Sequence, residues 1–108
     1  NPMSEGILGG NIRAMGLVQV TFDPASIATV TTAEQTMTVP GVKLGDFVFV
    51  SKPTATAGFG VVNARVSAAD TVAITAVNPT AGAVNPGSET WTVLWVRPSG
   101  SIPGATGD

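Results

Sequence analysis

The sequence predicts an all-β domain: a small antiparallel β-sandwich or barrel, jelly-roll-like, with an extended N-terminal arm and a C-terminal tail. Three observations indicate this class: six short runs of β-favouring residues, Gly and Pro between the runs, and very few helix-forming stretches. Short strands separated by such turn residues are typical of sandwiches and small barrels. A chain of 108 residues has room for one domain of this kind.

The six predicted strands follow one another with clear turn signals between them. In chain order they cover residues 17–22, 35–39, 47–51, 60–66, 71–77 and 90–96. Asp23-Pro24 ends the first strand, Pro40-Gly41 the second and Arg97-Pro98 the last, because proline cannot donate to a strand ladder. Only residues 25–28 and 66–70 are compatible with a turn of helix. We therefore expect a β domain at 17–97, an N-terminal arm at 1–16 and a C-terminal tail at 98–108.

Two of the predicted strands are apolar on both faces. Alternate residues of a strand point to opposite sides, so Phe47 and Phe49 share one face while Val48 and Val50 share the other. The last strand has Trp91, Val93 and Trp95 on one face and Thr92, Leu94 and Val96 on the other. A strand with one solvent-exposed face alternates apolar and polar residues. Apolar residues on both faces therefore predict that a neighbouring subunit covers the second face. The alternative is that the aromatic residues all lie in one intramolecular core.

The terminal segments are rich in Gly and Pro, yet they contain apolar residues. Ile7, Leu8, Ile12 and Met15 stand in the front segment, and Ile102 stands in the last one. We expect these segments to be arms that lie on neighbouring subunits; the alternative is that they lie on their own domain. The sequence thus yields a set of candidate interface residues: Ile7, Leu8, Ile12, Phe47, Phe49, Trp91, Trp95 and Ile102.

Charge is scarce and unevenly spread along the chain. The sequence holds 5 Lys and Arg and 7 Asp and Glu, which is 11% of its residues, against about 25% in ordinary soluble domains. The net charge of −2 and the few basic residues argue against a nucleic-acid partner. No apolar run is long enough to cross a membrane, so we expect no membrane partner. A surface this neutral favours coverage by other protein.

Few residues of this chain are suited to catalysis or to holding a cofactor. It has no His and no Cys, which removes imidazole bases, thiol nucleophiles and the usual zinc ligands. No two acids stand at alternate positions of one loop, as a calcium site requires. Gly6-Ile7-Leu8-Gly9-Gly10 and Gly58-Phe59-Gly60 lack the other residues of a phosphate-binding loop. We therefore expect that the chain is not an enzyme and that it binds no metal and no cofactor. A glycosidase that uses Asp46 and Asp70 as its paired acids is the weakest alternative.

Two segments resemble a small β module of tailed-phage virion proteins. They are residues 38–50, with Val39-Pro40-Gly41 followed by Gly45-Asp46 and alternating Phe and Val, and residues 66–86, in which Val77-Asn78-Pro79 recurs as Val84-Asn85-Pro86. The similarity extends over roughly residues 17–97. Proteins with this module include capsid decoration (cement) proteins and parts of tail fibres or spikes.

The resemblance implies a structural protein on the outer surface of a phage capsid. Its partners would be the major capsid protein and neighbouring copies of itself, in a homotrimer that binds the coat lattice and stabilises the head. The alternative is a trimeric tail-fibre or spike module that recognises a host surface glycan through Trp91 or Trp95.

Overall fold

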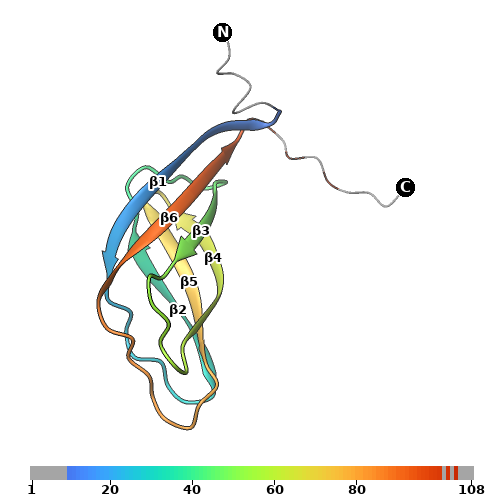
Figure 1. The fold of residues 1–108 in the computed structure, drawn as a ribbon. Helices are drawn as coiled ribbons and strands as arrows, with labels where there is room; N and C mark the ends of the chain where they lie inside the picture. The colour runs from blue at the N-terminus through green and yellow to red at the C-terminus, as the bar shows by residue number, and fades with distance from the viewer. Residues whose placement is uncertain (1–9, 101, 103, 105–108) are drawn as a thin grey trace.

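The computed structural model describes residues 10–100, 102 and 104, and it shows two three-stranded antiparallel sheets packed as a β-sandwich (Figure 1). The strands are β1 (Ile12–Phe22), β2 (Thr31–Thr38), β3 (Phe47–Ser51), β4 (Gly60–Ala68), β5 (Thr71–Asn78) and β6 (Glu89–Pro98). One sheet has the order β1-β6-β3 and the other the order β2-β5-β4. The predicted all-β class is therefore confirmed, with the sandwich as its form, and each predicted strand overlaps an observed one.

Two of the expected boundaries differ from the structure. β1 begins at Ile12, so residues 12–16, expected in the N-terminal arm, belong to the sheet. Gly16 lies opposite Trp95 of β6, and a Cβ atom at Gly16 would be 2.8 Å from the Trp95 indole Nε1. This glycine makes room for a ring inside a strand, whereas the sequence reading took it as part of an irregular segment. β6 likewise extends to Pro98.

Neither stretch that was compatible with a helical turn is helical. Ile27 forms an isolated antiparallel bridge with Val84, and residues 66–70 form the end of β4 and the turn that leads into β5. β-Branched residues and tertiary pairing thus outweigh the helix propensity of the few alanines in these short stretches. The described part of the chain contains no helix that could span a membrane.

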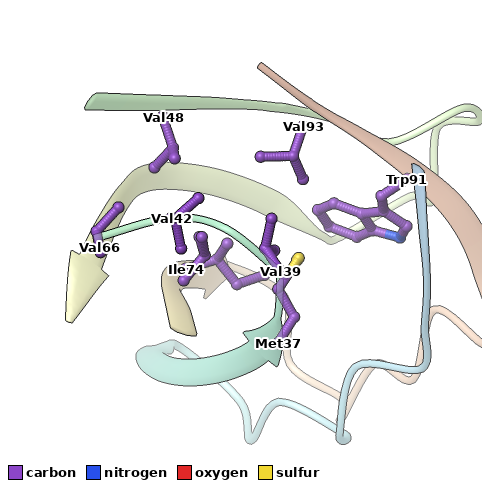
Figure 2. Packing of buried hydrophobic residues seen from close by; sticks show 9 residues of the cluster. Met37, Val39, Val42, Val48, Val66, Ile74, Trp91 and Val93 are labelled. Carbon is purple, nitrogen blue, oxygen red and sulfur yellow. The ribbon is translucent and has the colours of Figure 1, made fainter. Parts of the chain in front are cut away.

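The hydrophobic core lies between the two sheets (Figure 2). It takes buried side chains from strands of both sheets and from the loop between β2 and β3: Met37, Val39, Val42, Val48, Val66, Val72, Ile74, Trp91 and Val93. Trp91 is 0% exposed and packs edge to face against Phe22, with ring centroids 5.4 Å apart. Its indole N–H has no acceptor among the described residues, so packing alone holds this ring.

The loop of residues 39–46 carries the chain from one sheet to the other. Val39 N donates to Asp70 O (2.8 Å), Asp70 N donates to Val42 O (2.9 Å), and Gly41 N donates to the Asp70 carboxylate (2.8 Å). Gly41 has a φ of 99°, a conformation that glycine adopts without steric cost. Asp70, in the tight turn between β4 and β5, thereby fixes the loop that positions β3.

Candidate interaction surface

The outer face of the β2-β5-β4 sheet is polar. Thr32, Glu34, Thr36 and Thr38 of β2 point outward and are exposed. Across this face, Arg65 of β4 donates from Nε and Nη2 to the two Glu34 carboxylate oxygens, at 2.8 and 3.0 Å. The hydrogen bond from Arg65 lowers the pKa of Glu34 below its ordinary value. Threonines and an exposed ion pair are typical of a sheet face in contact with water.

The outer face of the β1-β6-β3 sheet is apolar, and the register of the strands shows how its side chains are arranged. Leu94 of β6 lies between Leu17 of β1 and Phe49 of β3. One step along, Val96 lies between Met15 and Phe47. These two rows form the apolar face, which we define by six residues: Met15, Leu17, Phe47, Phe49, Leu94 and Val96.

The outermost side chains of the apolar face are well exposed. Leu17 is 71% exposed, Phe49 64%, Phe47 52% and Met15 43%, while Leu94 is half-buried between its neighbours. At about 200 Å² for a whole large side chain, these four leave roughly 450 Å² of apolar surface in water. That is the size of the largest apolar patch on a typical monomer, and such patches often mark interaction sites.

Polar residues border the apolar face at both ends. The next row is Gln19, Thr92 and Ser51, and beyond Met15 at the other end of β1 stands exposed Arg13. An uncharged apolar centre with a polar border is the usual composition of a protein–protein contact.

Two ion pairs hold β3 against β6, one at each end of this short strand. Before β3, the Asp46 carboxylate accepts from Arg97 Nη2 (2.8 Å) and Nε (3.0 Å). After β3, Lys52 Nζ lies 2.8 Å from Glu89 Oε1. The hydrogen bond from Arg97 lowers the pKa of Asp46, and those from Lys52 and Thr54 lower the pKa of Glu89. The charges that flank β3 are therefore paired with β6 and leave the apolar face uncharged.

A groove runs between the edges of the two sheets, beside the apolar face. It is lined by residues 45–49 on the β3 side and 63–66 on the β4 side, with a volume of about 540 Å³. Val62, at a register shift of β4, is 61% exposed nearby. The free edge of β3 faces this groove.

The structure brings together only part of the predicted interface set. Phe47 and Phe49 lie side by side on the apolar face, Ile12 is half-buried at the start of β1, and Ile102 is 50% exposed beyond β6. Ile7 and Leu8 lie outside the described residues. Whether any of them contacts a partner stays a prediction.

The two tryptophans of the predicted set point away from the apolar face. Trp91 is fully buried in the core, and half-buried Trp95 lies over Gly16 with the Arg97 guanidinium 4.8 Å from its ring. The physical reason is alternation, because these residues share the face of β6 that points toward the other sheet. Neither ring is presented on the apolar face.

The predicted interface set did not include the two β1 members of this surface, Met15 and Leu17, although Met15 was named among the apolar residues of the N-terminal arm expected to lie on a neighbouring subunit. The alternation of exposed and half-buried residues along β1 places both on the outer side. Only the pairing of β1 with β6, rather than with its neighbour in sequence, puts them beside Leu94 and Val96. Met15 and Leu17 are two residues apart, which is the spacing of one strand face. Gly16 between them led to the prediction of an irregular arm instead of a strand.

The carboxylates considered for catalysis have structural partners. Asp46 is bonded to Arg97 and to the backbone N–H of Lys43, and Asp70 is bonded to Gly41. Among the described residues there is no group of three or more acids that could hold a metal ion.

Comparison of the chain with protein-family models, with curated proteins and with solved structures finds no match. The case for a function therefore depends on the contrast between the two outer sheet faces and on the sequence resemblance at residues 38–50 and 66–86.

Proposed function

We propose that this chain is a structural protein of a tailed-phage virion: a capsid decoration protein that binds the coat lattice as a homotrimer and stabilises the head. The observation that carries the proposal is the apolar, uncharged outer face of the β1-β6-β3 sheet in a domain whose other outer face is polar. A face of this kind is suited to permanent burial against protein.

The resemblance to virion modules supports the fold of the proposal more than its binding surface. Within residues 38–50, Val39 and Val42 are core residues, Gly41 and Gly45 adopt positive φ, and Asp46 pairs with Arg97. These shared residues build the crossover between the sheets, whereas Phe47 and Phe49 of the same segment lie on the apolar face. What the module binds is decided by its outer faces.

A low charge count is consistent with the mechanism of such a protein. Each copy that covers a seam between coat subunits adds apolar burial, at about 25 cal/mol per Å², less the freedom lost on binding. Many identical weak contacts together then resist the internal pressure of packaged DNA. A neutral surface allows copies to pack side by side on the lattice without mutual repulsion.

Glycan recognition by a tail-fibre or spike module stays the alternative, and the placement of the two tryptophans gives it little support. That reading needs an exposed tryptophan beside polar groups, whereas Trp91 is 0% exposed and Trp95 packs between Gly16 and Arg97. No other observation on the described residues favours it.

The test is binding to phage heads. Heads assembled from the coat protein of the same phage, without this protein, are mixed with the purified full chain, sedimented and heated. We expect saturable co-sedimentation, in multiples of three copies per site, and a higher temperature of head disruption. Heads that neither retain the protein nor gain heat resistance would refute the proposal, and tryptophan fluorescence titrated with a glycan panel serves as the check on the alternative.

A further inference from the structure

We propose that the apolar face, Met15, Leu17, Phe47, Phe49, Leu94 and Val96, is the surface through which copies of this chain bind one another. The inference rests on the proposed function for the existence of a homo-oligomer and adds which surface joins its members. In a homotrimer, each copy would turn this face toward the common axis.

The first step is that the face is built as the centre of an interface. Its side chains form two full rows across three strands, because Leu94 is flanked by Leu17 and Phe49, and Val96 by Met15 and Phe47. The border of Gln19, Thr92 and Ser51 supplies hydrogen-bonding groups at its rim. An exposed area of roughly 450 Å² is little more than half of what each partner buries in a stable complex, so the rim has to take part.

The second step is that a second copy fits this face better than a charged partner does. None of the outward residues at 15, 17, 47, 49, 94 and 96 is charged, and the acid and the base that flank β3 are paired with β6, which leaves Arg13 at the border of the face. A charged partner surface would lose its hydration here and gain no counter-charge. The same face on a second copy is equally large, apolar and free of charge, so the two match without repulsion.

The third step is that the neighbouring strand edge carries none of the features that keep copies apart. Edge strands are commonly protected by charges, proline or bulges. β1 has Arg13 and a register shift, β2 has Glu34, and β4 has Arg65 and two register shifts. β3 reads Phe-Val-Phe-Val-Ser, with none of these features in the strand itself. This edge adjoins Phe47 and Phe49, so the least protected edge and the apolar face form one continuous surface.

The test is the oligomeric state of the full chain and of three variants. Leu17→Lys and Phe49→Lys place a charge on the apolar face at exposed positions, and Thr36→Lys places the same charge on the polar face of the other sheet. All three positions are at the surface, so each variant is expected to fold, which far-ultraviolet circular dichroism checks. Sedimentation velocity over a micromolar range measures assembly.

We expect an oligomer for the wild type and for Thr36→Lys, and monomers for Leu17→Lys and Phe49→Lys. Burial of an unpaired ammonium should raise the dissociation constant at least about a hundredfold. A monomeric wild type, or oligomers that persist in both face variants, would overturn the inference.

Head binding by the same proteins separates this inference from the proposed function. If Leu17→Lys and Phe49→Lys stay oligomeric but no longer bind heads, the face contacts the coat protein and the inference is wrong while the proposed function stands. If the wild type is an oligomer that the two face variants disrupt, yet it never binds heads, the inference holds and the proposed function fails.

Discussion

Asp46 and Arg97, 51 residues apart in sequence, join the loop before β3 to the end of β6. The Asp46 side chain is 2% exposed and the Arg97 side chain 23%. Arg97 Nη2 also donates to Gly41 O, at 2.9 Å, and the guanidinium stacks over Trp95. One arginine thereby fixes both ends of the crossover loop and covers an indole ring that closes the core. The position of β3, and with it Phe47 and Phe49 of the apolar face, depends on this contact.

Removal of the Asp46 carboxylate should destabilise the domain. We expect Asp46→Ala to lower the free energy of unfolding by about 2–4 kcal/mol, because Arg97 and the Lys43 N–H lose their acceptor in a buried place. Urea unfolding followed by circular dichroism measures the change. Asp23→Ala, at an exposed position after β1, is the matched control and should cost far less. Equal losses in the two variants would contradict the structural role assigned to Asp46.

The same carboxylate predicts how stability responds to acid. The hydrogen bond from Arg97 lowers the pKa of folded Asp46 below its ordinary 3.8. Its contribution is therefore fully present above that value and is lost as the pH falls through the lower pKa of the folded state. Glu34 and Glu89, whose pKa values are also lowered by their partners, act in the same direction.

We expect Asp46→Asn to lose less stability than the wild type between about pH 5 and about pH 2, because the variant has no carboxylate left to protonate at this position. Thermal unfolding at a series of pH values makes the comparison. Two curves that fall in parallel over this range would show that Asp46 is not a source of the acid sensitivity.

The strands could be predicted from local pattern because turn residues and β-branched residues both act locally. Pro40-Gly41 and Asp23-Pro24 mark the ends of β2 and β1 to within a residue or two. The failures occur where a tertiary contact sets the boundary. Gly16 is part of a strand because β1 pairs with β6 at this position, and Ile27 is paired because residue 84, far along the chain, lies beside it.

The candidate surface was predicted only in part, because strand order, which the local pattern does not contain, decides which faces point outward. The two apolar faces of β3 are visible in its sequence, and Phe47 and Phe49 are indeed exposed. Which face of β6 points inward is not visible, because both of its faces carry large apolar residues. Strand order decides it: β6 lies between β1 and β3, and the second sheet covers the side of Trp91 and Val93.

Asn78 and Asn85 stand in the same Asn-Pro context but in different environments. Asn78 is 0% exposed, and its Nδ2 donates to Ile27 O (3.0 Å) and Gly82 O (2.8 Å) while its Oδ1 accepts from Thr80. Asn85 is exposed and accepts from Gly87 N at 3.2 Å. The buried residue ties together the two long connections at one end of the sandwich, whereas the exposed one shapes a single turn.

We expect Asn78→Ala to cost about 3 kcal/mol of unfolding free energy, since the Ile27 and Gly82 carbonyls each lose one of two donors and Thr80 N and Oγ1 lose their acceptor. Asn85→Ala should cost less than about 1 kcal/mol. Asn78→Asp should be at least as harmful as Asn78→Ala, because a carboxylate oxygen would face the carbonyls of Ile27 and Gly82. Urea unfolding of the three variants gives the order. A tolerated Asn78→Asp would contradict the assignment of Nδ2 as the atom that faces these carbonyls.

Gly16 and Gly60 both lie in strands, and they test how closely a strand is packed against the side chain opposite it in the same sheet. A Cβ at Gly16 would meet Trp95 Nε1 at 2.8 Å and Cε2 at 2.9 Å, whereas one at Gly60 would meet only Val77 Cγ1, at 3.4 Å. We expect Gly16→Ala to lower the free energy of unfolding by about 1–3 kcal/mol through overpacking, and Gly60→Ala to have little effect. Because Trp95 must move away from its contact with Arg97, the tryptophan emission of Gly16→Ala should also shift to longer wavelength. Equal stability and unchanged emission in the two variants would show that the ring has room to turn aside.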